Sequence, residues 1–169
     1  MNLQNLKDKI FYSSFSKNFS HPADRRRFYG YLKKIKIEKY LCTNYENAKI
    51  IYLTNSINTD LSFFYYYLKK NKKLVIFDLC DAYFSEKKSF QKTFRSIYKF
   101  IIRENKYFHF TQTGLLKKIC TIANIIICSS EEQKKEILKY NKNVFIIHDF
   151  LDNEIYNYNS KLILENNTL

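Results

Sequence analysis

The chain has 169 residues, of which 46% are hydrophobic and 18% are aromatic. This length suffices for one well-buried core and is too short for two ordinary domains, while the composition excludes general disorder. The formal net charge is +13, from 29 Lys and Arg against 16 Asp and Glu. A basic chain of this kind is compatible with a nucleic-acid or membrane-surface partner. Because Lys, Asn, Ile, Tyr and Phe share A/T-rich codons, base-composition drift is the explanation that we favour.

The cysteines and the apolar runs indicate in which cellular compartment the protein is expected. The four cysteines are far apart and form no C-x-x-C pair, so we expect reduced thiols and no metal site. The first fifteen residues contain charges and no sustained apolar core, and no apolar run reaches about 18 residues. We therefore expect neither a signal peptide nor a membrane span. The predicted location is cytoplasmic, and peripheral contact with the inner face of the membrane stays open.

The first half of the chain alternates between predicted strands and helices. A strand over residues 10–15 precedes a helix that opens at Pro22, because proline suits the first helical position. A second strand over residues 49–54 leads to a helix capped by Asn58 or Thr59, and a third strand covers residues 74–77 and ends at Asp78. Helical spacing marks the buried faces of the two helices, as Phe28, Leu32 and Ile35 in the first and Leu61, Phe64, Tyr65 and Leu68 in the second.

Two further helices are predicted over residues 87–104 and 110–122. The inward stripe of the first is Phe90, Phe94, Ile97 and Ile101. Its other side carries five basic residues that could instead lie on anionic lipid: Lys88, Lys92, Arg95, Lys99 and Arg103. A helix that packs on the core and exposes a basic face to solvent has the same pattern, and we favour this alternative.

The clearest unit runs from Ala123 to Asp152. The apolar runs 125–128 and 144–147 have the pattern of strands buried on both faces. Between them, Ser129 and Ser130 each precede an acid or amide by three residues, which predicts a capped helix start. Strand, helix and strand in about thirty residues indicate a βαβ unit with parallel strands.

This order of elements predicts an α/β fold. We expect a single Rossmann-like, doubly wound parallel sheet of about five strands with helices on both faces. The domain would span residues 1–152. Residues 153–169 would form a polar tail that resembles the start of a further domain.

Ligands of open parallel sheets bind outside the carboxyl ends of the strands. Asp78 and Asp81 could be paired acid and base carboxylates, or either could instead be a turn residue or a partner for the arginines at 25–27. His148 beside Asp149 could be an oriented base, whereas Ser129 and Ser130 are expected to be helix caps. The other candidates at these strand ends are Ser16, Asn18, His21, Arg25, Asn55, Ser56 and Tyr83.

Several signatures of cofactor-binding and catalytic sites are absent from the sequence. No G-x-G-x-x-G follows the first strand and no G-x-x-x-x-G-K-[ST] exists, so we expect neither a dinucleotide site nor a P-loop. There is also no nucleophile elbow and no H-E-x-x-H. The sequence therefore predicts no cofactor and leaves the catalytic residues unknown.

Five segments, in this order, resemble the N-terminal domain of bacterial nucleotide-sugar glycosyltransferases of the GT-B type. They are FSHPADRRRFYGYLKK, AKIIYLT, FDLCDAYFS, ANIIICSSEEQKKEI and NVFIIHDFLD. The resemblance covers residues 10–152, and its most specific parts are S-H-P-x-D-R-R-R and C-S-S-E-E-Q-K. It implies a transferase half that faces a glycan or lipid-linked acceptor, while a second domain holds the nucleotide-sugar. Where many of these enzymes have a Gly-rich loop, this chain reads SKNFSHPADRRR, so the donor contact is not carried over.

The resemblance implies a truncated enzyme that is inactive by itself. With the strand-end rule, it assigns ten residues to an acceptor or interdomain cleft: Ser20, His21, Asp24, Arg25, Asp78, Asp81, Ser129, Ser130, His148 and Asp149. Two alternatives stay open. One is a basic module for a membrane surface or nucleic acid, of which nucleic acid is the less expected partner, and the other is a relic without function.

Overall fold

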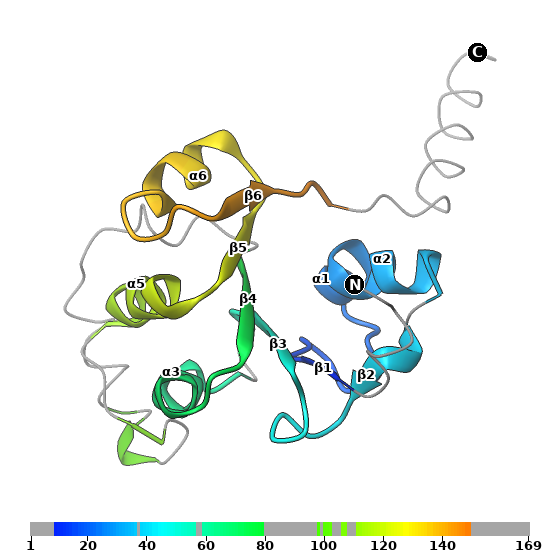
Figure 1. Ribbon diagram of the computed structural model, residues 1–169, viewed down its shortest axis with the longest axis horizontal. Helices are drawn as coiled ribbons and strands as arrows, with labels where there is room; N and C mark the ends of the chain where they lie inside the picture. Colours follow the sequence, from blue (N-terminus) through cyan, green and yellow to red (C-terminus); the bar gives the residue numbers. More distant parts are fainter. Residues whose placement is uncertain are drawn as a thin grey trace, which may run out of the picture.

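The computed structural model describes residues 9–36, 38–56, 59–79, 98, 100–102, 106–107 and 111–149. These residues form one open sheet of six strands in the order β2-β1-β3-β4-β5-β6, and every neighbouring pair is parallel. Helices α3, α5 and α6 cover one face, whereas α1 and α2 lie on the other (Figure 1). The predicted Rossmann-like α/β fold is confirmed.

The described elements are short. The strands are β1 Ile10–Tyr12, β2 Leu41–Cys42, β3 Ile50–Thr54, β4 Leu74–Leu79, β5 Ile125–Cys128 and β6 Val144–Ile146. The helices are α1 Pro22–Arg26, α2 Phe28–Lys34, the 3₁₀ turn η2 Glu38–Tyr40, α3 Leu61–Lys70, α5 Gln112–Ile122 and α6 Glu131–Ile137.

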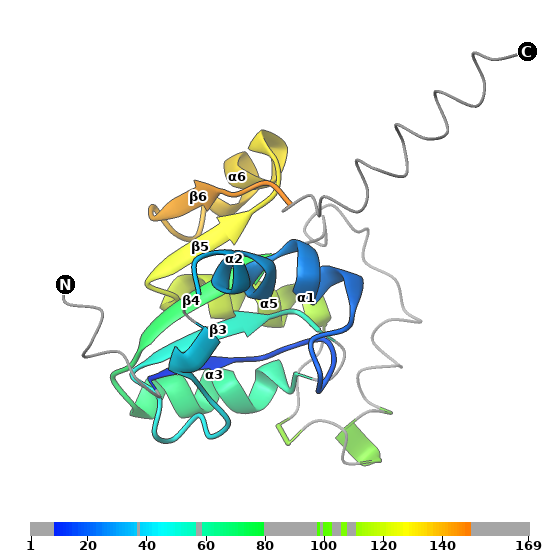
Figure 2. The same cartoon turned by 90° about the vertical axis from the view of Figure 1, so that its right-hand side faces the viewer.

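The strand order reverses next to β1. The chain leaves β1 through α1 and α2, returns as β2 on one side, and then crosses to β3 on the other side. Figure 2 shows α1 and α2 in front of the sheet. The point between β1 and β3 is therefore the topological switch point, the place where open parallel sheets usually bind ligands.

Three details differ from the sequence prediction. The two-residue strand β2 was missed, because a pair of residues has no periodicity to detect. The predicted first helix is broken at Arg27, whose φ of −109° and ψ of −136° are not helical, so α1 and α2 are separate. The third helix is capped by Asp60, whose side chain accepts from the Phe63 amide, and not by Asn58 or Thr59.

The core consists of two layers of unequal size. The larger layer lies between the sheet and helices α3, α5 and α6. In it, Ile51 of β3, Phe77 of β4 and Ile126 of β5 are fully buried. The smaller lies under α1 and α2 and is centred on Tyr12, Tyr52 and Ile127. Because both faces of the central strands are packed, their sequences are continuous apolar runs.

Part of the predicted structure lies outside the described residues. These parts include most of the 87–104 helix with its five basic residues, Asp81, and the tail from residue 150. Ile101, predicted to face the core, is 70% exposed, so its predicted burial was wrong. None of the helices in the described ranges is both long enough and apolar enough to span a bilayer.

Candidate functional site

All six strands point the same way, so their carboxyl ends form one edge of the sheet. Ser13 follows β1, Asn55 follows β3 and Ser129 follows β5. Asp78 lies near the end of β4 and His148 lies just beyond β6, so both are on this same edge, as predicted.

Arg27 holds this edge together. Its guanidinium donates through Nε and Nη2 to the two oxygens of Asp78, with Nε 3.2 Å from Oδ2, and both side chains are almost fully buried. Its Nη1 donates to the Ile147 carbonyl at 2.8 Å and to Asp149 Oδ1 at 3.1 Å. The Tyr52 hydroxyl donates to Asp78 Oδ2 at 2.7 Å. Asp78 is thus an arginine partner, which was one of the predicted alternatives.

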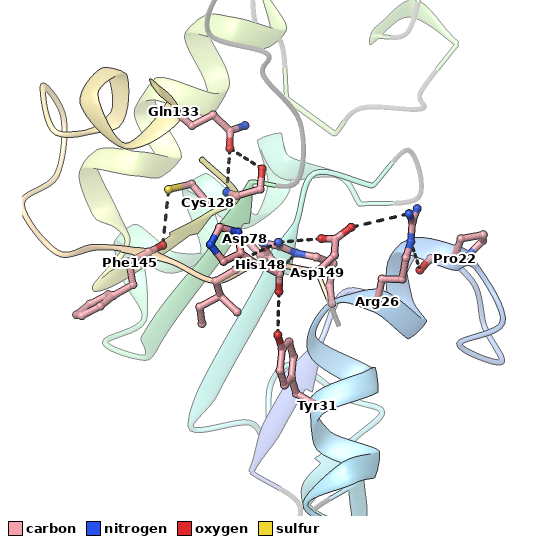
Figure 3. A network of polar contacts seen from close by, with 12 residues as sticks. Pro22, Arg26, Tyr31, Asp78, Cys128, Gln133, Phe145, His148 and Asp149 are labelled. Carbon is pink, nitrogen blue, oxygen red and sulfur yellow. Dashed lines mark hydrogen bonds and ion pairs between the residues drawn. The ribbon is translucent and has the colours of Figure 1, made fainter. Parts of the chain in front are cut away.

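The segment after β6 is bound to α1 and α2 by further contacts. Asp149 also lies 3.9 Å from Arg26, and the Tyr31 hydroxyl donates to the His148 carbonyl at 2.8 Å (Figure 3). Burial, with the nearby Asp78 carboxylate, raises the pKa of Tyr52 well above 10. Tyr52 therefore remains a neutral donor. The contacts of Arg26, Arg27 and Tyr31 fix the direction in which the chain leaves the sheet beside α1.

Asp24 organises the loop between β1 and α1. Its Oδ1 accepts from the Tyr12 hydroxyl at 2.6 Å and the Phe15 amide at 2.9 Å, and its Oδ2 accepts from the Ser16 amide at 3.0 Å. The Ser16 hydroxyl also donates to Oδ2 at 3.1 Å. Since Asp24 is fully buried, it shapes the loop and does not face a ligand directly.

The neighbouring predicted residues have local roles. His21 is the N-cap of α1, because its Nδ1 accepts from the Ala23 amide at 3.2 Å, and its ring stacks on Phe15. The Ser20 hydroxyl donates to Asn18 at 2.6 Å. Arg25 is exposed on α1, beside the ion-pair cluster.

Of the two serines after β5, Ser130 caps a helix as predicted, whereas Ser129 does not. The Ser130 side chain caps α6 by accepting from the Gln133 amide at 3.3 Å, while the Ser129 amide and hydroxyl both donate to Gln133 Oε1 at 2.9 Å. Of the ten predicted residues, the structure thus joins Asp78 and Asp149 through Arg27. It uses Asp24, His21 and the two serines for local structure.

A cavity with a volume of about 560 Å³ lies beside the carboxyl end of β1. Pairing between β1 and β2 ends at Phe11 and Cys42, so the cavity opens where β2 stops. Five aromatic rings and four small hydroxyl residues line it, together with one carboxylate: Phe11, Tyr12, Phe19, Tyr29, Phe64, Ser13, Ser14, Thr43, Thr59 and Glu38. Leu41 and Cys42 complete the wall.

Phe19 reaches this cavity in an unusual backbone conformation. Its φ is +57°, a left-handed value that costs a bulky residue about 1–3 kcal/mol. The ring stacks on Tyr29 with centroids 4.3 Å apart and lies 5.9 Å from Tyr12. Strained residues held by their surroundings are often found at functional sites, and here the strain places an aromatic face on the cavity wall.

Cys42 should be the most reactive of the three described cysteines. Burial raises the pKa of the Cys120 thiol to about 12 and also raises the pKa of Cys128, whereas Cys42 is half-buried and lines the cavity. We expect a maleimide to label Cys42 at least about tenfold faster than Cys120 or Cys128, because only accessible thiolates react. Peptide mapping by mass spectrometry in a Cys80→Ser background measures this directly, and equal labelling of all three would contradict it.

Sequence reasoning missed two contributors to this edge. Arg27 belongs to a run of three arginines, and no local pattern marks it as the buried one. Glu38 lies in a short 3₁₀ turn that was not predicted. Contacts with distant strands bury Arg27, whereas Glu38 stays exposed and lies on the cavity wall.

The carboxyl edge combines hydroxyls, aromatic faces and paired charges. Among the residues that the structure describes, no group of three His, Cys, Asp or Glu side chains is placed to hold a metal ion. Several polar residues at this edge are already bonded to one another. The cavity is therefore the part of the edge best suited to bind a small molecule. Comparisons with protein-family models, with curated proteins and with solved structures found no match to this chain.

Proposed function

We propose that this chain is the acceptor-side half of a glycosyltransferase, which transfers a sugar from a nucleotide-sugar donor to a glycan or lipid-linked acceptor. The observation that carries the proposal is the 560 Å³ cavity at the carboxyl edge, next to the switch point of the sheet. Its size lies within the range of small-molecule sites.

The lining of the cavity suits a sugar. A sugar ring has apolar C–H faces that pack on aromatic rings, and its rim of hydroxyls needs donors and acceptors. Phe19 and Tyr29 supply a stacked pair of rings, and Thr43 and Glu38 supply a hydroxyl and a carboxylate. A cavity for an apolar ligand would not need these polar groups, because leaving them unpaired costs free energy.

The donor diphosphate needs a second domain in this proposal. The loop after β1, where related sheets bind phosphates, closes on Asp24 through the amides of Phe15 and Ser16. Those amides are therefore not available to an anion. We infer that sugar transfer requires a donor-binding domain in addition to the six-stranded sheet. The six-stranded domain alone should not catalyse this transfer.

Ligand-detected NMR with a panel of mono- and disaccharides tests the acceptor site. We expect saturation transfer from the aromatic rings of the cavity, and we expect Thr43→Trp to weaken binding at least about tenfold by filling the cavity. Thr121→Trp, an equally exposed threonine on α5 across the sheet, is the matched control. Binding that Thr43→Trp leaves intact would overturn the site, and robust hydrolysis of a nucleotide-sugar by this chain alone would overturn the need for a second domain.

A further inference from the structure

We infer that the face of the sheet next to α2 is a docking groove for an amphipathic helix with acidic flanks, presented by a partner polypeptide. The groove is distinct from the cavity beside β1, and the inference does not depend on the proposed transferase activity. Four observations on the described residues support it: the pattern of exposed apolar side chains, the lining of the groove, its width and its charge.

The strand register shows which side chains share this face. Tyr12, Tyr52, Ile76 and Ile125 are successive partners across β1, β3, β4 and β5. In the next row, Asp78 pairs with Ile127 and Ile127 with Phe145. Side chains that are paired in a sheet point to the same face, so one apolar surface continues from under α2 to the outer strand β6.

Only one half of this face is covered by a described helix. Phe28 of α2 stacks on Tyr52 with centroids 3.8 Å apart and lies 5.1 Å from Tyr12, so α2 covers β1 and β3. On β6, Phe145 is 55% exposed and Ile147 is 38% exposed. Figure 3 shows the Phe145 ring extending away from Cys128 and Gln133, which belong to the opposite side of the sheet. Phe145 and Ile147 at the β6 side are therefore apolar and accessible, whereas Ile127 of β5 is buried.

Between the two halves lies a groove of about 270 Å³. Tyr31 forms one wall, Ile147 the other, and Ile76 and Ile127 the floor. The polar groups at its end, Arg27, Asp78 and Tyr52, are bonded to one another. The Tyr31 hydroxyl also has a partner, the His148 carbonyl. The groove thus offers a ligand mainly apolar contact, and these polar groups are already paired.

The width of the uncovered surface fits one helix. A helix with its side chains is about 10–12 Å across, and strands are about 4.8 Å apart, so one helix covers about two strands. α2 already covers β1 and β3. Beyond these two strands lie β4, β5 and β6. One helix over the outer two, β5 and β6, would bury Phe145 and Ile147, with Ile76 of β4 in the groove between this helix and α2.

Charge determines which kind of helix fits. Between residues 22 and 36 the exposed charged residues are all basic: Arg25, Arg26, Lys33, Lys34 and Lys36. The single acid in this segment, Asp24, is buried. Ile35, which is 60% exposed, lies one turn beyond Tyr31 on α2 and extends the apolar wall among these cations. An apolar stripe flanked by Asp or Glu complements this wall, whereas a basic helix would be repelled.

The test uses the full chain and a labelled synthetic peptide of about five helical turns, with leucine and phenylalanine at helical spacing and glutamate elsewhere. Fluorescence anisotropy measures its affinity. We expect binding that weakens as salt is raised, and no binding by the same peptide with lysine in place of glutamate. Phe145→Ser, and separately Lys33→Glu with Lys34→Glu, should each weaken binding about tenfold.

Matched variants on other surfaces serve as controls. Leu138→Ser changes a residue of α6 that is 45% exposed, and Lys69→Glu with Lys70→Glu reverses the same charge on α3, across the sheet. Both should change the affinity by less than about twofold. Thermal melts of every variant show whether the fold is intact.

Four outcomes would overturn the inference. The first is peptide binding that survives Phe145→Ser, and the second is equal binding of the lysine peptide. The third is a dimer, seen by sedimentation velocity, that Phe145→Ser dissociates, because a second copy would then occupy the groove. The fourth is Phe145-dependent binding to vesicles of phosphatidylcholine and phosphatidylglycerol without peptide binding, because the face would then serve a lipid surface.

Discussion

Replacing Arg27 with methionine is expected to lower the free energy of unfolding by about 3–5 kcal/mol. Methionine keeps much of the side-chain volume but leaves the carboxylate of Asp78 buried without its cation. Breaking a buried ion pair by removing one partner is strongly destabilising for this reason. The carbonyl of Ile147 also loses its donor, so we expect faster hydrogen exchange after β6. Urea unfolding followed by circular dichroism measures the first effect.

Arg26→Met is the matched control for Arg27→Met. Arg26 is the adjacent arginine, but its side chain is exposed and lies 3.9 Å from Asp149, which predicts a change below about 1 kcal/mol. In the Arg27→Met background, Asp78→Asn should restore part of the loss, because it removes the unpaired buried charge. Equal effects of Arg27→Met and Arg26→Met would show that the buried pair does not stabilise the fold.

Asp24→Asn should lower the free energy of unfolding by about 3 kcal/mol. The substitution replaces one carboxylate oxygen by an amide nitrogen, which cannot accept the hydrogen bonds that this oxygen accepts in the wild type. Either the Tyr12 hydroxyl and the Phe15 amide or the two Ser16 donors lose their acceptor. Because this loop carries Phe19 to the cavity wall, saccharide binding should fall as well. Hydrogen exchange of the Phe15 and Ser16 amides should rise first.

Glu136→Gln provides the comparison for a carboxylate changed to its amide. Glu136 is exposed on α6 and pairs only locally with Lys139, so its substitution should cost less than about 0.5 kcal/mol. An Asp24→Asn protein as stable as the Glu136→Gln protein would mean that the buried bonds of Asp24 contribute little to the loop.

Local patterns in the sequence predicted most of the elements. The apolar runs of β3, β4 and β5 identify strands, because most of their side chains are buried on both faces. The run of β6 also identifies a strand, although Phe145 is exposed. Pro22 marks the start of α1 and Ser130 the start of α6, because helix ends are satisfied by residues within a turn of them. The parallel direction of the strands followed from the helices between them.

The candidate site was predicted only in part. Asp78 and His148 were correctly placed on one edge, since parallel strands bring their carboxyl ends together. Asp24 and His21 were placed near that edge but serve local structure, which residue type alone does not reveal. The local role of Ser130 as a helix cap was predicted. The cavity was not predicted, because it exists only where the two-residue strand β2 stops beside β1.

By itself, then, the sequence determined the alternation of strands and helices, the parallel sheet and the edge at which polar residues collect. These depend on periodicity and caps, which act within about one or two turns of chain. Only the tertiary structure decided that Arg27 is the buried arginine, that a cavity opens beside β1 and that β6 exposes Phe145. Those features depend on residues that are far apart in the sequence, such as Arg27 with Asp78 and Asp149, at separations of 51 and 122 residues. No local pattern encodes a contact over such a distance, because it forms only when the sheet brings the two segments together.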